Sequence, residues 1–191
     1  TVEECLMCHS DSGLSTERDG REISLHVPPE EYKNSLHGGM ECIEGHYDHT
    51  SEDFVHPGYV EDVDCEECHE GQARIYAGSL HGKAVKQGEE LAPRCWDCHE
   101  PHNTLDAQNP ASHVNKFNIP YVCGSCHKEG TEVNKRYDIP KEQILTHYSL
   151  SIHGEGLFRK GLTVSAVCTD CHTSHNIRSH TDPESSIYKE N

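Results

Sequence analysis

The chain has 191 residues, of which 33% are hydrophobic and 6% aromatic, and its formal net charge is −17. This composition is too poor in apolar side chains for an ordinary core and approaches that of disordered chains, so a bound cofactor is needed to supply apolar surface. The sequence contains no basic patch, which excludes nucleic acid as a partner. It also contains no apolar run long enough to span a membrane, so no integral membrane segment is expected.

Ten of the eleven cysteines lie in five copies of one pattern, Cys-x-x-Cys-His, at residues 5–9, 65–69, 95–99, 123–127 and 168–172. On a helix, positions i, i+3 and i+4 share one face. Both thiols can therefore bond the vinyl groups of one porphyrin while the histidine binds its iron, and the pattern predicts covalent attachment of haem c. The predicted thioether residues are Cys5, Cys8, Cys65, Cys68, Cys95, Cys98, Cys123, Cys126, Cys168 and Cys171, and the proximal iron ligands are His9, His69, His99, His127 and His172.

Other uses of paired cysteines fit this sequence less well. A tetrahedral zinc site needs further ligands at matching spacings and does not place a histidine directly after every second cysteine. Thioredoxin-like motifs occur singly beside a βαβ pattern, which is missing here. A disulfide framework would leave the five adjacent histidines unexplained.

An irregular copy of the pattern, Cys42-Ile43-Glu44-Gly45-His46, has glycine in place of the second cysteine. It predicts a sixth haem, held by one thioether from Cys42 with His46 as the proximal ligand. The alternative is a decayed site with a free thiol. Counted in chain order, the irregular motif is the second of six haem motifs.

Three segments share the pattern Tyr-x-x-Ser-x-His-Gly, at residues 32–38, 76–82 and 148–154; we name them the first, second and third Tyr–His segments. Proline and acidic residues at 28–31 and 140–142 predict helix starts before two of them, and the glycine predicts a helix stop. The histidines, His37, His81 and His153, are predicted at the ends of short helices as distal ligands of neighbouring haems. The alternative role is a surface histidine that caps a helix end.

Further distal candidates follow a proximal histidine by three residues. His102 and His175 cannot reach the opposite face of the preceding iron, so they are predicted to bind an adjacent haem; His49 has the same spacing. The remaining distal candidates are His113 and His56, whereas solvent-facing or hydrogen-bonding roles are expected for His26, His147 and His180. Because methionine is scarce, bis-histidine ligation is expected, which keeps the potentials comparatively low.

Residues 79–118 are repeated in 151–191, with an offset of about seventy residues. The second copy ends without counterparts of His113 and of the motif at 123–127, which associates His113 with the haem at His127 or a neighbour. Haems are expected to form the core of a single elongated domain spanning 1–191, with mostly irregular loops, short α-helices and almost no sheet.

These units resemble the multihaem c-type cytochromes of anaerobic respiration and extracellular electron transfer, which include the polymerising nanowire cytochromes. The resemblance implies electron transfer through six haems (at least five), without enzymatic activity, between redox partner proteins. It leaves two alternatives open: a multihaem reductase of a nitrogen or sulfur compound with one open haem site, and a monomeric shuttle in place of a homopolymeric filament with inter-subunit haem contacts.

Covalent haem attachment takes place outside the cytoplasm, so an exported protein of the periplasm or cell surface is expected. Thr1 is then expected to follow a cleaved signal peptide.

Overall fold

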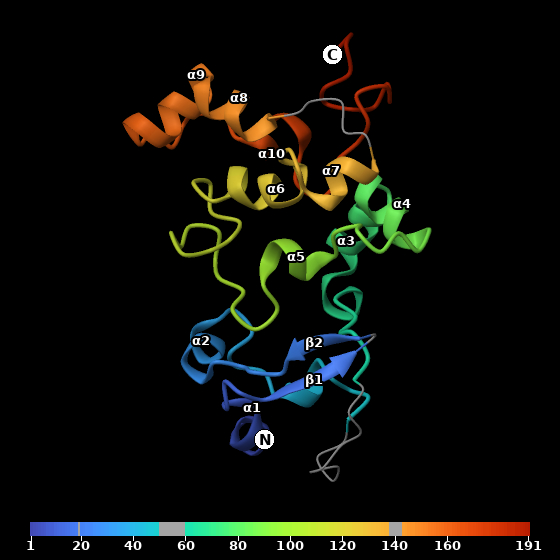
Figure 1. The fold of residues 1–191 in the computed structure, drawn as a ribbon, viewed down its shortest axis with the longest axis vertical. Helices are drawn as coiled ribbons and strands as arrows, with labels where there is room; N and C mark the ends of the chain where they lie inside the picture. Colours follow the sequence, from blue (N-terminus) through green and yellow to red (C-terminus); the bar gives the residue numbers. More distant parts are fainter. Residues whose placement is uncertain (19, 50–59, 138–142) are drawn as a thin grey trace.

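The computed structural model describes residues 1–18, 20–49, 60–137 and 143–191. The body is elongated, with the N-terminus at one end and the C-terminus at the other (Figure 1). Short helices joined by long connections make up most of the described chain. The helices are α1 (Val2–His9), α2 (Pro29–Asn34), η1 (Cys42–Glu44), α3 (Glu66–Ala77), α4 (Leu80–Lys86), α5 (Cys95–His99), α6 (Ile119–His127), α7 (Glu132–Arg136), α8 (Ile144–Leu150), α9 (Ile152–Gly154), η2 (Glu155–Arg159) and α10 (Cys168–His172).

One antiparallel hairpin follows α1, formed by β1 (Ser15–Arg18) and β2 (Arg21–Ser24). In the turn between the strands Gly20 has a φ of 74°, which favours glycine. The hairpin returns the chain to the end of α1, where the Val27 N–H donates to the His9 carbonyl at 2.7 Å. This small sheet therefore lies next to the first haem motif.

Very few apolar side chains are buried. Among the described residues, the buried hydrophobic side chains are those of Tyr32, Leu157 and Val167. Burial of a large apolar side chain contributes about 1.5–3 kcal/mol, so three of them cannot offset the conformational entropy of so long a chain. The protein chain alone does not form a sufficient core.

The repeated stretches adopt the same hydrogen-bonding pattern up to their ends. The amide of Asn118 donates to the carbonyls of Pro110 and Ser112, both at 2.9 Å. The amide of Asn191 donates to the carbonyls of Pro183 and Ser185 in the same way, at 3.3 and 2.8 Å. The relation between the two stretches thus extends from sequence to local structure.

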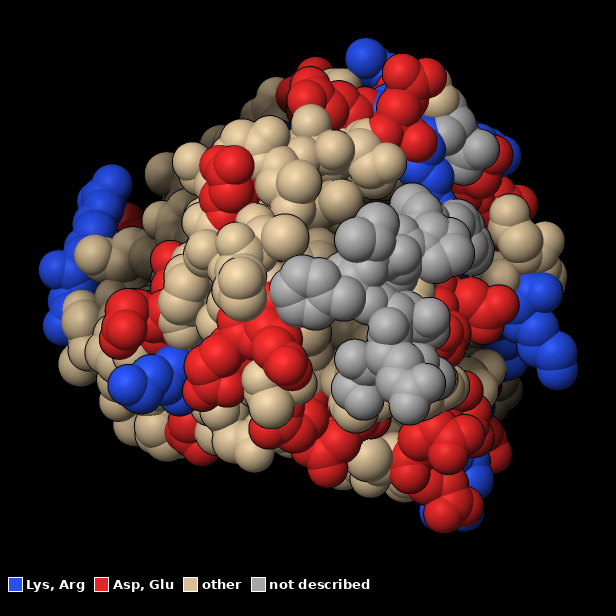
Figure 2. All heavy atoms as spheres, turned by 90° about the horizontal axis from the view of Figure 1, so that it is seen from below, with Lys and Arg blue, Asp and Glu red and all other residues tan. Residues whose placement is uncertain are grey.

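Acidic side chains dominate the surface at the N-terminal end. Seen from that end, Asp and Glu spread over the face, while Lys and Arg lie mostly towards its rim (Figure 2). No helix in the described part of the chain has the length and apolar character needed to cross a membrane.

Candidate haem sites

Each haem motif lies on a short helix that ends at or beside its histidine. Helices α1, α5, α6 and α10 end at the histidine, and the third motif opens α3, where His69 departs from helical geometry with φ −111° and ψ 39°. The irregular second motif begins on the single turn η1. The prediction that each motif occupies one helical turn is confirmed for the five complete copies.

An acidic residue inside three of the motifs fixes where the helix begins. Asp97 accepts the backbone N–H of Arg94 at 2.6 Å, and Asp170 accepts that of Val167 at 2.8 Å. Glu44 of the irregular motif accepts the Glu41 N–H at 2.6 Å. These carboxylates satisfy donors that a helix start leaves unpaired.

Among the described residues, four pairs of imidazole rings from distant segments face one another. The ring centroids are 6.1 Å apart for His37 and His69, 6.2 Å for His46 and His102, 6.0 Å for His81 and His127, and 6.0 Å for His99 and His175. A histidine nitrogen binds a transition metal at about 2 Å, and its ring centre lies roughly 1 Å further away. Two histidines on opposite sides of one iron therefore have centroids about 6 Å apart, so the observed pairs fit bis-histidine haem.

Every pair combines one predicted proximal histidine with one predicted distal histidine. His37 and His81 face the third and fifth motifs, while His102 and His175 face the second and fourth. The irregular motif shares this arrangement, because its histidine, His46, has a facing partner like those of the complete copies.

Burial of these rings favours the neutral imidazole that binds metal. Burial lowers the pKa of His81 and of His102, and the facing rings of His127 and His46 add to the effect. Burial also lowers the pKa of His99 and of His127. The lowered pKa values of these four histidines favour the neutral form that an iron ligand requires.

Neighbouring cysteines group the six motifs into three pairs. Burial and the adjacent Cys5 thiol raise the pKa of Cys42 to about 11, and burial and the Cys95 thiol do the same for Cys65. A hydrogen bond with Cys168 raises the pKa of the Cys123 thiol. Motifs one and two, three and four, and five and six are therefore adjacent in space, and none of the eleven cysteines forms a disulfide.

Contacts between histidines agree with this grouping and connect successive motifs. His9 lies close enough to His102, the ring facing the second motif, to lower its pKa. In the same way, His69 helps to lower the pKa of His99, and His172 helps to lower that of His127. Between the second and third of these pairs, Cys126 lies beside Cys98 and contributes to its raised pKa. The spatial order of the motifs thus follows their order in the sequence.

The first motif is oriented by the chain that follows the hairpin. The Nδ1 of His9 lies 2.8 Å from the Leu25 carbonyl. Such a bond fixes the ring and makes Nε2 the metal-binding atom, as is usual for histidine ligands.

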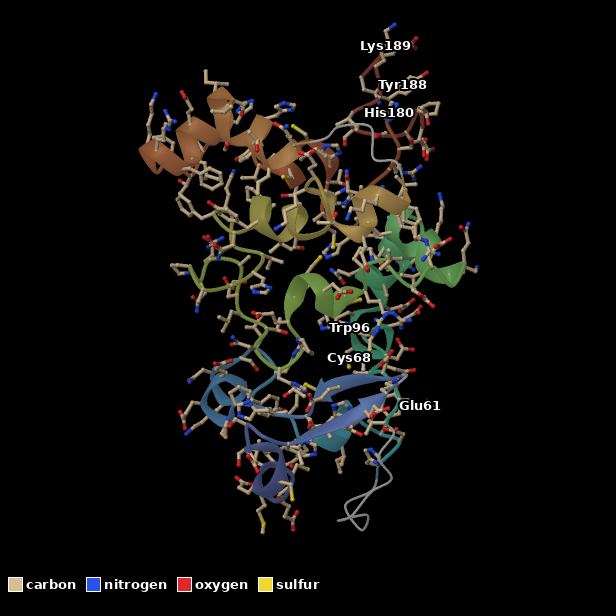
Figure 3. The ribbon with its side chains drawn as sticks, in the orientation of Figure 1. Glu61, Cys68, Trp96, His180, Tyr188 and Lys189 are labelled. Atoms are coloured by element: carbon tan, nitrogen blue, oxygen red, sulfur yellow. The ribbon has the colours of Figure 1, made fainter. Side chains whose placement is uncertain are left out.

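The remaining distal candidates have other surroundings. His113 contacts the Glu100 carboxylate at 3.0 Å, and the ring that faces His127 is that of His81. Within the described residues no imidazole ring faces His153 or His172. The candidate His56 lies outside the described residues, and His180 lies at the C-terminal end, far from Cys68 and Trp96 of the third and fourth motifs (Figure 3).

The prediction that glycine ends the helix of each Tyr–His segment is wrong in all three segments, and in the first α2 already ends at Asn34, before His37 and Gly38. Ser79 and Ser151 cap new helices by accepting the N–H groups of Gly82 and Gly154 at 3.0 and 3.2 Å. The histidine therefore lies at the start of a helix, in α4 and α9. Glycine is needed for space, because a Cβ on Gly82 would lie 2.1 Å from the Tyr76 carbonyl oxygen.

At the irregular motif, the Val63 side chain lies beside Gly45, the residue that stands where a complete motif has its second cysteine. A Cβ on Gly45 would meet the Val63 methyl groups at 3.7 and 3.9 Å, which is ordinary van der Waals contact. An apolar side chain therefore lies beside the position that the second thioether would occupy.

No family model, curated protein or solved structure matches the chain significantly. Within the part that the structure describes, no group of three or more His, Cys, Asp or Glu side chains converges as a metal site.

Sequence reasoning did not assign a role to the tyrosines of the Tyr–His segments or to the acidic residues that start the motif helices. The signal for the tyrosines was present, because each precedes the segment's histidine by five residues.

Proposed function

We propose that the chain conducts electrons through six c-type haems, each carried by one motif and ligated by two histidines. The observation that carries this proposal is the set of four facing imidazole pairs at 6.0–6.2 Å. Haem, when bound, supplies a one-electron iron couple. The motif cysteines would bind it by thioethers, and at four of the motifs the facing pairs would supply two histidine ligands.

Filled axial positions favour conduction over catalysis at these four motifs. A haem enzyme needs an iron with an open or exchangeable site, whereas each of these motifs presents a second histidine. The Val63 side chain beside Gly45 also supports a haem at the irregular motif, since the space that a cysteine would fill is apolar.

Haem counting and carbon monoxide binding test the proposal together. Intact mass is expected to show six haems, and a Cys42→Ala variant five, because its only thioether residue is removed. The spectrum of the reduced wild-type protein is expected to be unchanged by carbon monoxide. Binding of carbon monoxide to one haem would contradict a pure conduit and favour the reductase.

A backbone hydrogen bond that the first two Tyr–His segments make, and that the third lacks within the described residues, supports a head-to-tail homopolymer. In the first and second segments the N–H groups of Leu36 and Leu80 donate to the carbonyls of Thr104 and Ile177, both at 2.8 Å. These acceptors each lie five residues after a motif histidine. In the third segment no carbonyl of the described residues accepts the Ile152 N–H.

The partner proposed for the third segment is a second copy of this chain. Ile152, next to His153 in the chain, is 82% exposed. The contacts of the first two segments are made with residues that follow haem motifs, at Thr104 and Ile177. A haem motif of the next subunit would complete the series, and such a heterologous contact generates an open filament.

Electron microscopy of the native protein tests the polymer, with filaments as the expected result. An Ile152→Glu variant places a charge in the proposed contact and is expected to give single particles with an unchanged haem count. Single particles of the wild-type protein at all concentrations would favour the monomeric shuttle.

A further inference from the structure

We infer that Tyr32, Tyr76 and Tyr148 are positioning residues that tie each histidine-bearing segment to the haem motif that follows it. One segment thereby holds the iron ligand of one haem and fixes the backbone of another. This inference rests on the proposed function and adds a role for residues outside the haem ligands.

The three tyrosine hydroxyls donate to the same position of three different motifs. The acceptors are the carbonyls of Met40, Pro93 and Ala166, at 2.7 Å for Tyr32 and 3.0 Å for Tyr148. Each acceptor lies two residues before the first cysteine of the second, fourth or sixth motif.

Loop length does not explain this coincidence. The sequence separation from tyrosine to acceptor is 8 residues in the first case, 17 in the second and 18 in the third. Connections of such different lengths nevertheless bring the same carbonyl to the hydroxyl. The hydrogen bond therefore defines where the motif begins.

The tyrosine hydroxyls are partly buried hydrogen-bond donors that lie near the cysteines predicted to form thioethers. Burial raises the pKa of Tyr76 to about 12 and also raises the pKa values of Tyr32 and Tyr148. Each phenol stays protonated and able to donate. The thiols close enough to contribute to these shifts include Cys42, Cys95 and Cys168, the first cysteines of the motifs concerned.

The other end of each segment is fixed to the tyrosine backbone. The carbonyls of Tyr32, Tyr76 and Tyr148 accept the N–H of the serine three residues later, at 3.0, 2.9 and 3.0 Å. The glycine then passes so close that a Cβ would lie 2.0–2.4 Å from these carbonyl oxygens. The turn that carries the histidine is thus held against the residue whose hydroxyl holds the next motif.

Tyrosine and histidine of one segment serve different haems. Tyr32 binds the start of the second motif while His37 faces His69 of the third. Tyr76 binds the start of the fourth motif while His81 faces His127 of the fifth. These segments therefore bridge the junctions between successive motif pairs, from motif two to three and, alongside the contact of Cys98 with Cys126, from four to five.

A Tyr76→Phe variant of the haem-loaded full chain tests this role, because phenylalanine keeps the packing and removes only the donor. The electron paramagnetic resonance signals of the haems at His99 and His127 are expected to shift or broaden. Amide hydrogen exchange of residues 95–99 is expected to rise by about two- to tenfold, as for loss of one hydrogen bond. Tyr32→Phe is expected to move the signals at His46 and His69 instead.

The matched control is Tyr188→Phe, whose side chain lies at the C-terminal end, away from Cys68 and Trp96 of the third and fourth motifs (Figure 3). Signals in Tyr76→Phe that equal those of wild type and control would overturn the inference, as would an equal shift of all haems. Haem count and the response to carbon monoxide are measured on the same samples. A wild-type protein that carries fewer than six haems or binds carbon monoxide contradicts the proposed function. If the wild type gives the expected results and only the expected signal shifts of the variants are missing, only the positioning role is contradicted.

Discussion

The second and third Tyr–His segments have the same local structure and different surroundings. In both, a tyrosine hydroxyl reaches the backbone before a haem motif, a serine caps the next helix, and a glycine passes the tyrosine carbonyl. The second segment places His81 opposite His127 and donates from Leu80 to Ile177. Within the described residues, the third segment makes neither contact.

The difference teaches that local sequence builds the histidine-bearing turn, whereas a distant part of the chain decides what the histidine meets. Both segments carry the same pattern, but the second is followed by three haem motifs, at residues 95–99, 123–127 and 168–172. The third is followed by the sixth motif alone, which its own Tyr148 already holds.

Removal of haem is expected to have the largest effect and to abolish the structure of both segments. Because few apolar side chains are buried in the described chain, the largest of them those of Tyr32, Leu157, Val167 and Pro120, protein produced without haem attachment is expected to be unfolded. Far-ultraviolet circular dichroism and hydrogen exchange measure this. Protected amides in residues 148–154 of the haem-free chain would show that the third segment folds alone.

Replacement of the histidine is expected to have different effects in the second and third Tyr–His segments. His81→Ala is expected to leave one iron with a single protein ligand, so that the reduced protein binds carbon monoxide at about one haem in six. His153→Ala is expected to leave the spectrum of dispersed single subunits unchanged. Identical difference spectra for the two variants would contradict the distinction drawn between the segments.

The glycines should behave alike, because the constraint on them is local. Gly82→Ala and Gly154→Ala each introduce a Cβ about 2 Å from a carbonyl oxygen, and each is expected to destabilise the haem-loaded protein by about 1–3 kcal/mol. The midpoint of thermal unfolding measures the loss. Gly71→Ala is the control, since a Cβ there meets nothing within 4 Å; an equal effect at all three sites would contradict the close approach.

The serine caps should give the smallest effect, again similar in the two segments. Ser79→Ala and Ser151→Ala each remove an acceptor for a helical N–H, which costs about 1 kcal/mol. Chemical denaturation of the haem-loaded variants measures it. Loss at one site alone would mean that the tertiary surroundings, and not the local cap, determine stability there.

Local features of this protein were accessible from the sequence. The Cys-x-x-Cys-His spacing predicted one helical turn per motif, and α1, α5, α6 and α10 end at the motif histidine. Pro29 was predicted to start a helix and does so in α2. The start predicted at 140–142 falls outside the described residues. The role of the glycines was misread, because glycine as a helix stop and glycine at a close backbone approach look the same in sequence.

The pairing of the histidines was not accessible in this way. His37 and His81 face motifs later in the chain, whereas His102 and His175 face earlier ones. The two histidines of a pair are separated by a different number of residues in each case. The entropic cost of closing a loop rises only slowly with its length, so loop length does not indicate which histidines pair.

The sequence by itself determined the haem motifs, their helical turns and the three Tyr–His segments, because these depend on residues a few positions apart. Only the tertiary structure decided which histidine faces which motif, the order of motifs along the body and which carbonyl accepts the hydrogen bond of each tyrosine hydroxyl. These contacts join segments far apart in the chain, and nothing in the local pattern encodes them.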